Sequence, residues 1–464
     1  MIGEMTLDRL MIAAPGSGSG KTMVTCGLLT ALKKMRSVAA FKCGPDYIDP
    51  MFHRQALGIP SCNLDTFLVG DAAVPALMAA SARSHQADLA LVEGVMGYYD
   101  GLGGFSDRAS SYDVARVTKT PVILLVDVKG MSLSAAALVR GFTAFRKDHG
   151  ICGILLNRAS PMIYERMKQA VEAETGIPVL GYVPVTKAID FPSRHLGLMR
   201  PEELSDLKEG LESLAERLKE TVDLPALLAA AKAAPPLLYA ADLYPEAAPG
   251  AIQGLRIGLA EDEAFCFYYE ENLQLLKKAG AVLVPFSPIH DRHLPEDLDG
   301  LYMGGGYPEL YGEGLSANQS MKKDVLAALE GGMPCIAECG AYMYLQSQME
   351  DEAGRVWDMT GFFEGRAFPC GHLVHFGYAH VTMEEDSVLG KAGLSLPVHE
   401  FHYWDVAGET FAASAKKPAG GRTWRCMQVK KETAAGFPHL YFPAEPAMVT
   451  HFLDRCRAFR EKRA

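Results

Sequence analysis

The sequence predicts an α/β protein with two doubly wound domains, and three observations support that prediction. The chain has 464 residues, which is too long for one ordinary core at about 100–200 residues per domain. Short apolar runs alternate with helical patterns up to about residue 184, and again from about residue 255. An alanine- and proline-rich stretch, residues 222–253, lies between the two alternations and reads as a connection.

In the first alternation the candidate strands are apolar on both faces, as central parallel strands are. They are residues 10–14, 37–42, 89–94, 121–127 and 153–157. Helical patterns separate them at residues 21–35, 132–148 and 164–175. We therefore expect an N-terminal domain over residues 1–230 and a linker over residues 231–253.

The second alternation predicts a C-terminal domain over residues 254–464. Its expected strands are residues 255–261, 281–286, 299–305 and 334–337, and its expected helices are residues 271–280 and 319–332. The remainder is rich in aromatic and turn residues, which favours more strand and loop.

Composition narrows the range of partners. A net charge of −11 supplies no basic field for nucleic acid or an anionic membrane, and no apolar run approaches about 18 residues. Ten cysteines are scattered without the spacing of a disulfide framework or a zinc site. We expect a cytoplasmic protein that binds small molecules, with its oligomeric state left open.

A phosphate-binding loop is predicted at "IAAPGSGSGKTMVT", residues 12–25, between a strand and a helix. Its glycines allow backbone N–H groups to converge on a phosphate beside a helix N-terminus. Lys21 would reach the outer phosphates of ATP, and the Thr22 hydroxyl would bind Mg²⁺. The residues expected to bind the nucleotide are Gly16, Gly18, Gly20, Lys21, Thr22 and, at the end of a later strand, Asn157 as a contact for the purine edge.

The magnesium site needs carboxylates as well. Glu93 ends an apolar strand, where open α/β sheets bind ligands. The loop "FKCGPDYIDP", residues 41–50, adds Lys42, Asp46 and Asp49. We assign Thr22, Glu93 and Asp46 to the metal, and Lys42 and Asp49 to a substrate that carries acid groups.

Cys339 lies in "AECGA", at a tight turn between an apolar strand and a helical pattern. A thiol there is exposed to the dipole of a helix N-terminus, which favours the thiolate and a nucleophilic role. Backbone N–H groups of Gly304 to Gly306 are candidate donors to an oxyanion. The histidines spaced i, i+3, His372 with His375 and His399 with His402, are expected to be packed or hydrogen-bonded rather than to bind zinc.

These motifs together closely resemble the cobyrinate a,c-diamide synthases, and the resemblance spans nearly the whole chain. It rests on "APGSGSGKT", "KCGPDYIDP", "NLD", "EGVMGYYDG", "LNR", "PSRHLGL", "AFCFYYEENL", "GGGYPELYGEGLSANQSM", "AECGAYMYL", "HEFHY" and "PHLYF". The resemblance implies an N-terminal domain similar to dethiobiotin synthetase that forms amides with ATP, and a C-terminal glutaminase domain of the class I type.

By that resemblance Cys339 is the glutaminase nucleophile and His439 is its catalytic histidine. Full triad glutaminases carry a glutamate two residues beyond the histidine, a position that Tyr441 occupies here. What orients His439 is therefore open, with a backbone carbonyl or another carboxylate as the alternatives. Arg194 and His195, in a family-like loop, join Lys42 as expected contacts to an anionic substrate.

The implied reaction is the ATP- and glutamine-dependent amidation of the a and c carboxylates of cobyrinate through acyl phosphates, in cobalamin biosynthesis. Two alternatives remain. A nickel-sirohydrochlorin a,c-diamide synthase of coenzyme F430 biosynthesis would carry similar motifs. A switch ATPase with a degenerate glutaminase domain is disfavoured, because Cys339 and His439 are present and position 16 is glycine rather than lysine.

Overall fold

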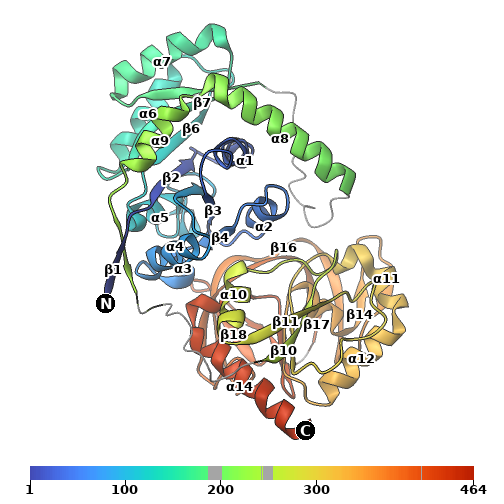
Figure 1. Cartoon of the computed structure of the whole chain (residues 1–464). Coiled ribbons are helices and arrows are strands. Elements are labelled where there is room, and N and C mark those ends of the chain that lie inside the picture. Colours follow the sequence, from blue (N-terminus) through green and yellow to red (C-terminus); the bar gives the residue numbers. More distant parts are fainter. Residues whose placement is uncertain (186–200, 242, 244–253, 409, 464) are drawn as a thin grey trace. The chain divides into compact units, whose positions relative to one another are not determined.

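The computed structural model describes residues 1–185, 201–241, 243, 254–408 and 410–463. The chain divides into two compact units, Met1–Pro245 and Glu246–Ala464, and each has its own central sheet (Figure 1). Both are α/β, and the predicted fold class is confirmed.

The first unit is built on a parallel sheet with the strand order β4-β3-β5-β2-β6-β7-β8. Its strands are β2 (Asp8–Ala13), β3 (Val38–Cys43), β4 (Ser61–Leu64), β5 (Leu89–Glu93), β6 (Val122–Asp127), β7 (Ile151–Ala159) and β8 (Val179–Pro184). The apolar runs predicted as strands lie here as β2, β3, β5, β6 and β7. Almost every residue in them is buried, because helices cover both faces of a parallel sheet.

Helices connect the parallel strands of this unit, as crossover connections require. They are α1 (Lys21–Leu32), α2 (Ile48–Gln55), α3 (Thr66–Val69), α4 (Ala73–Ser84), α5 (Ser111–Thr118), α6 (Ser134–Phe145), α7 (Pro161–Thr175), α8 (Pro201–Thr221) and α9 (Leu224–Lys232), with a 3₁₀ turn η1 at Leu102–Gly104. α1 begins directly after the predicted phosphate loop, so the strand–loop–helix order is as predicted.

The segment predicted as a linker is partly regular structure. Residues 231–232 end α9, and β9 (Leu237–Ala240) pairs antiparallel with β1 (Ile2–Met5). The sequence did not indicate this strand, because its partner lies more than 230 residues away. The first unit accordingly extends to Pro245 rather than to residue 230.

The second unit has a central sheet with the strand order β11-β10-β12-β13-β21-β20, parallel except for β20. Its strands are β10 (Leu255–Ala260), β11 (Ala281–Phe286), β12 (Gly300–Met303), β13 (Cys335–Glu338), β20 (Gln428–Lys430) and β21 (Thr433–Gly436). Its helices are α10 (Glu270–Lys278), α11 (Gly312–Ala317), α12 (Gln319–Glu330), α13 (Gly340–Tyr344) and α14 (Pro446–Arg463), with 3₁₀ turns η3 (Pro308–Tyr311) and η4 (Phe442–Ala444).

A second, mostly antiparallel sheet follows in the region where the sequence predicted strands and loops. It comprises β14 (Gln346–Glu350), β15 (Val356–Asp358), β16 (Phe363–Met383), β17 (Ser395–Ala407), β18 (Ala413–Lys416), β19 (Thr423–Cys426) and β22 (His439–Leu440). The long strands β16 and β17 pair with each other, and β22 pairs with β17 through His399 opposite His439. The HEFHY stretch thereby lies beside the predicted catalytic histidine.

Among the residues that the structure describes, no helix is both long and apolar enough to cross a lipid bilayer.

Candidate active sites

The phosphate loop lies between β2 and α1 and faces open space. A Cβ built on Gly16 or Gly18 would meet no atom within 4 Å. The Lys21 ammonium group donates to the backbone oxygens of Gly16, at 3.0 Å, and Met96, at 2.5 Å. Burial, followed by the nearby charge of Lys42, lowers the pKa of Lys21 to about 8. These contacts hold the lysine at the loop, where an anionic phosphate would favour its charged form.

Gly20 shows why this loop position needs glycine. Its φ of 84° is in the left-handed region, and a Cβ there would lie 2.6 Å from Nδ2 of Asn157. The Asn157 amide donates to the carbonyl of Ser19 at 2.8 Å, and its Oδ1 accepts from the N–H of Arg158. Asn157 therefore braces the loop, and a contact with a purine remains a prediction.

A buried charge cluster lies beside the loop at the end of β5. The Thr22 hydroxyl donates to Oε1 of Glu93 at 2.6 Å, and the Lys42 ammonium donates to the same oxygen at 2.8 Å. Lys42 also forms an ion pair with Asp49. Nε2 of His53 lies 3.5 Å from Oε2 of Glu93. The predicted residues Thr22, Glu93, Lys42 and Asp49 are thus gathered in one place.

The charges of this cluster depend on one another. Burial alone would raise the pKa of Glu93, but Lys42 holds it below the usual range. Burial and the neighbouring Glu93 raise the pKa of Asp49. Although burial opposes it, the carboxylates of Asp49 and Glu93 raise the pKa of Lys42. The cluster is therefore an ammonium group shared between two carboxyl groups whose pKa values are shifted in opposite directions.

Asp46 lies apart from these contacts. Its Oδ1 accepts from the backbone N–H of Ile48 at 2.8 Å and so caps the turn that enters α2. Asp49, one helical turn further on, reaches the cluster instead. Arg194 and His195 lie outside the described residues.

Cys339 lies at the turn between β13 and α13, in the second unit. Its φ of 50° and ψ of −105° are a strained combination for a residue with a Cβ. Its backbone N–H donates to the carbonyl of Gly436 at 2.7 Å, and the N–H of Gly340 lies within hydrogen-bonding reach of its sulfur. This is the elbow that the sequence predicted for a nucleophile.

His439 lies beside this elbow. A Cβ built on Gly305 would be 2.8 Å from Cε1 of His439 and 3.3 Å from Cβ of Cys339, so both residues border the same point. His439 is 2% exposed, and burial, followed by the positive charge of His402, lowers its pKa to about 3. Burial, followed by Glu309, raises the pKa of the Cys339 thiol. Burial thus outweighs the helix dipole, and the expectation that the thiolate is favoured was wrong for this site without substrate; the imidazole beside it can accept the thiol proton.

Backbone donors surround the same point. The N–H of Gly304 donates to the Tyr268 hydroxyl at 2.8 Å, which removes it from the predicted oxyanion donors. The nitrogen of Gly306 lies 3.1 Å from a Cβ built on Gly340, so it faces the start of α13. Gly306 and Gly340 thus remain as candidate donors near the thiol, together with the predicted Gly305.

Comparison with known proteins identifies the family. Residues 10–198 match the CobQ/CobB/MinD/ParA nucleotide binding domain, and residues 256–446 match the CobB/CobQ-like glutamine amidotransferase domain. A cobyrinate a,c-diamide synthase of Listeria monocytogenes is 42% identical over 96% of this chain and 98% of that protein. Another, of Salmonella typhimurium, is 40% identical over 96% of this chain and 98% of that protein. The chain belongs to the cobyrinate a,c-diamide synthase family.

Membership in this family makes the chain a carbon–nitrogen ligase of cobalamin biosynthesis, with glutamine as the amido donor. The nucleotide-binding domain supports the use of ATP. The first unit of the ligase then holds the phosphate loop, and the second holds the thiol and imidazole.

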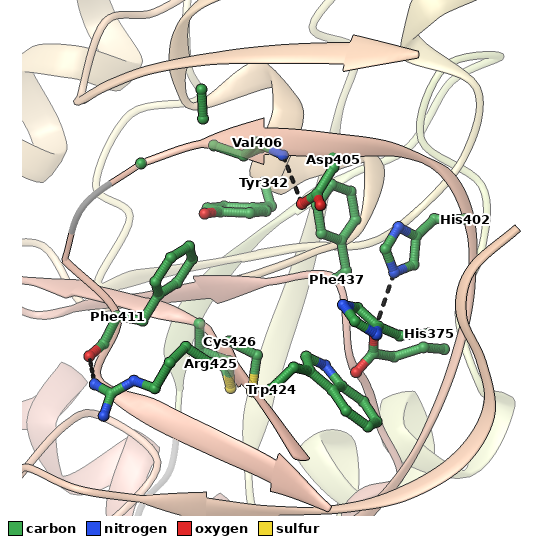
Figure 2. Close-up of a pocket in the computed structure, with 14 residues that line it drawn as sticks. Tyr342, His375, His402, Asp405, Val406, Phe411, Trp424, Arg425, Cys426 and Phe437 are labelled. Atoms are coloured by element: carbon green, nitrogen blue, oxygen red, sulfur yellow. Dashed lines mark hydrogen bonds and ion pairs between the residues drawn. The ribbon is translucent and has the colours of Figure 1, made fainter. Parts of the chain in front are cut away.

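A cavity of about 280 Å³ lies in the second unit of the ligase, and Figure 2 shows the side chains that line it. Oε2 of Glu400 and Nε2 of His402 form a hydrogen bond at 3.0 Å, and His402 stacks on Phe437 with ring centres 4.0 Å apart. His375 stacks on Trp424. His375 is packed, and His402 is both packed and hydrogen-bonded, which agrees with the sequence prediction for these two histidines. The stack on Phe437 also supports the segment that leads from Gly436 to His439.

Two residues of these sites were absent from the sequence predictions. His53 lies within α2, and no local sequence pattern marks it as a site residue, because its partner Glu93 is 40 residues away. Glu338 directly precedes the nucleophile in AECGA, and its Oε2 lies 3.6 Å from Nδ1 of His439. Its place beside Cys339 was a signal that could have singled it out.

Gly305→Ala tests the closeness of thiol and imidazole. The added methyl group would displace His439, because a contact of 2.8 Å to Cε1 is too short. We expect kcat/KM for glutamine hydrolysis to fall about a hundredfold, the usual scale for a misplaced catalytic group. Gly314→Ala in α11, whose Cβ would meet Ile289 at an ordinary 3.4 Å, is the matched control and should retain the wild-type rate. Equal rates for the two variants would contradict the geometry.

Proposed function

We propose that this ligase uses ATP and glutamine to amidate the a and c carboxylates of cobyrinate. The observation that carries the proposal is the pairing within one chain of a phosphate loop with a strained cysteine beside a histidine. The names of the relatives, which match over 96% or more of the chain, supply the substrate.

Ammonia release is assigned to the second unit. The proton of the Cys339 thiol passes to His439 as sulfur attacks the carboxamide carbon of glutamine. The N–H groups of Gly306 and Gly340 face the oxyanion that forms. Collapse of this intermediate breaks the carbon–nitrogen bond, and His439 returns the proton to the leaving ammonia. Water then hydrolyses the glutamyl thioester.

Carboxylate activation is assigned to the first unit. A carboxylate does not condense directly with ammonia in water, because oxide is too poor a leaving group. A substrate carboxylate oxygen attacks the γ-phosphorus of ATP, which forms an acyl phosphate and releases ADP. Ammonia then displaces phosphate to give the amide. Lys21 stabilises the charge that develops on the transferring phosphoryl group.

Magnesium fits the donors at the phosphate loop. Oxygen ligands suit this cation, and the hydroxyl of Thr22 and the carboxylate of Glu93 already meet at 2.6 Å. Thr22 and Glu93 would hold the ion, with Asp49 the nearer second carboxyl group in place of Asp46. When bound, the ion neutralises negative charge on the phosphates of ATP.

Lys42 and Asp49 are proposed to switch partners during this reaction. The shared ammonium of Lys42 is the only basic group within the described part of this cluster that pairs with both Asp49 and Glu93. If Glu93 turns toward a cation, Lys42 is released to face a substrate carboxylate. Arg194 and His195 remain proposed as further contacts to the acidic macrocycle.

Mass spectrometry tests the proposal directly. The enzyme is incubated with ATP, Mg²⁺ and glutamine, with either cobyrinate or nickel-sirohydrochlorin as the acceptor. Two successive losses of 1 Da from cobyrinate, dependent on ATP, are the expected result, since each amidation replaces OH by NH₂. Amidation of nickel-sirohydrochlorin alone would move the enzyme to coenzyme F430 biosynthesis. ATP hydrolysis without any amide product would favour the switch ATPase.

A further inference from the structure

The carboxyl group beside His439 comes from a residue that precedes the histidine in the sequence, not from one that follows it. Position 441, two residues after the histidine, is a buried tyrosine whose ring contacts Tyr269 with centres 4.8 Å apart. On the Nδ1 side of the imidazole lies Glu338, with its Oε2 at 3.6 Å. Glu338 ends β13 and is the residue directly before the nucleophile.

The Glu338 carboxyl group is buried, and hydrogen-bond donors fix its orientation. It is 2% exposed, and it accepts hydrogen bonds from the backbone N–H of Leu440 and, at 3.4 Å, from the Tyr302 hydroxyl. Asn272 fixes both donors, because its amide donates to the Tyr302 hydroxyl at 3.0 Å and to the Leu440 carbonyl at 2.8 Å. Burying a carboxyl group costs free energy of desolvation, even when donors hold it on two sides. Its presence here therefore favours a functional role.

We propose that Glu338 is the positioning residue for His439: its carboxylate accepts a hydrogen bond from Nδ1–H and so directs Nε2 toward the Cys339 thiol. The inference rests on the proposed glutaminase function and adds a residue to it. Glu338 and Cys339 are consecutive, so a single strand end fixes both the nucleophile and the residue that orients its base. The gap of 3.6 Å is longer than a hydrogen bond, as catalytic contacts often are before substrate binds.

The proton balance explains what the carboxylate does. When sulfur bonds to the carboxamide carbon, the S–H bond breaks and its proton goes to Nε2. The ring is then an imidazolium with protons on both nitrogens, and its charge faces Glu338. When the carbon–nitrogen bond breaks, the Nε2 proton leaves with ammonia and the imidazole is neutral again. Burial raises the pKa of Glu338, the Leu440 N–H and the Tyr302 hydroxyl lower it, and its ionised form stabilises the charged ring.

Another buried carboxyl group near His439 has a different partner. Glu400 of β17 hydrogen-bonds His402 at 3.0 Å, and Nδ1 of His402 is bound in turn to the Trp404 carbonyl. The titratable groups around His439 are Glu338 and Cys339 from β13 and its turn, and His399, Glu400 and His402 from β17. Of these groups, Glu338 is the one with a carboxyl oxygen within ion-pair distance of Nδ1 of His439.

Glu338→Gln is the test, with glutamine hydrolysis measured as kcat, KM and their pH dependence. A glutamine here can donate to Nδ1 and so favour the wrong tautomer, and we expect kcat to fall about a hundredfold or more. KM should stay within about twofold, because Glu338 does not touch the substrate. The acid limb of kcat/KM should move to lower pH, because the imidazole loses the anion that favours its protonation. Glu338→Asp, which keeps the charge, should restore part of kcat and the position of the acid limb.

Control variants separate the outcomes. The Glu400 charge also raises the pKa of His439, so Glu400→Gln should move the acid limb, but by less than Glu338→Gln does, because only Glu338 lies within ion-pair distance of Nδ1. If Glu400→Gln moves the limb and Glu338→Gln does not, the inference is overturned in favour of Glu400. If kcat and the pH profile of Glu338→Gln match the wild type, no carboxylate at 338 is needed and the inference fails. Cys339→Ser separates failure of this inference from failure of the proposed function. If Cys339→Ser still hydrolyses glutamine, the thiol is not the nucleophile and the proposed function itself fails.

Discussion

Replacing Cys339 by serine should remove glutamine-driven amidation and leave ammonium-driven amidation intact. The thiol is the proposed acceptor of the glutamyl group, and loss of a nucleophile of this kind costs at least about a thousandfold. Free ammonia needs no thioester, so the activated carboxylate can still be captured. The measurement is the rate of amide formation with saturating glutamine and, separately, with ammonium at a pH where free ammonia is abundant.

The control for this variant is Cys370→Ser on β16, a half-buried thiol that is assigned to neither site. It should retain both activities. Equal loss of glutamine-driven and ammonium-driven amidation in Cys339→Ser would contradict the assignment of the two half-reactions to separate units.

Replacing Lys21 by methionine should have the opposite result. Amidation should fall about a hundred- to a thousandfold with either nitrogen source, because the charge that stabilises the transferring phosphoryl group is lost. Glutamine hydrolysis assayed alone should continue. The Lys34→Met control removes an exposed cation just after α1 that pairs with Glu212, and it should keep both activities.

This substitution should not lower the thermal unfolding midpoint at pH 7. The pKa of Lys21 falls to about 8 in the folded protein, below the usual value of an unfolded chain, so the folded state binds its proton less well. The charged lysine therefore opposes folding below pH 8, and this effect diminishes as the pH rises through that value. A marked drop in the midpoint would show instead that the backbone contacts of Lys21 outweigh the cost of burying its charge.

Features encoded by local pattern were predicted well. The strand–loop–helix order around Lys21 follows from glycine spacing and apolar runs, and the elbow at Cys339 follows from a short strand that meets a helical pattern. Features decided by distant pairing were missed. Strand β9 is stable because β1 lies beside it, and nothing within residues 237–240 reveals that partner.

The direction in which a side chain points was the other feature that the sequence did not predict. Asp46 and Asp49 are both acidic residues on one loop, and we assigned Asp46 to the metal although residue type alone does not show which side chain lies nearer Glu93. The start of α2 separates them: Asp46 caps the turn, while Asp49 points into the cluster. Glu338 was overlooked for the same reason, since its role depends on a histidine 101 residues later in the chain.

The bond from the Cys339 amide to the Gly436 carbonyl ties together two segments that lie almost a hundred residues apart. It continues the pairing of β13 with β21, two inner neighbours of the central sheet. The bond thus fixes the turn that carries the sulfur to the strand end three residues before His439, and breaking it would disturb the central sheet of the unit. In hydrogen–deuterium exchange, the amide of residue 339 should be among the last in its half of the chain to take up label, unlike a typical active-site loop.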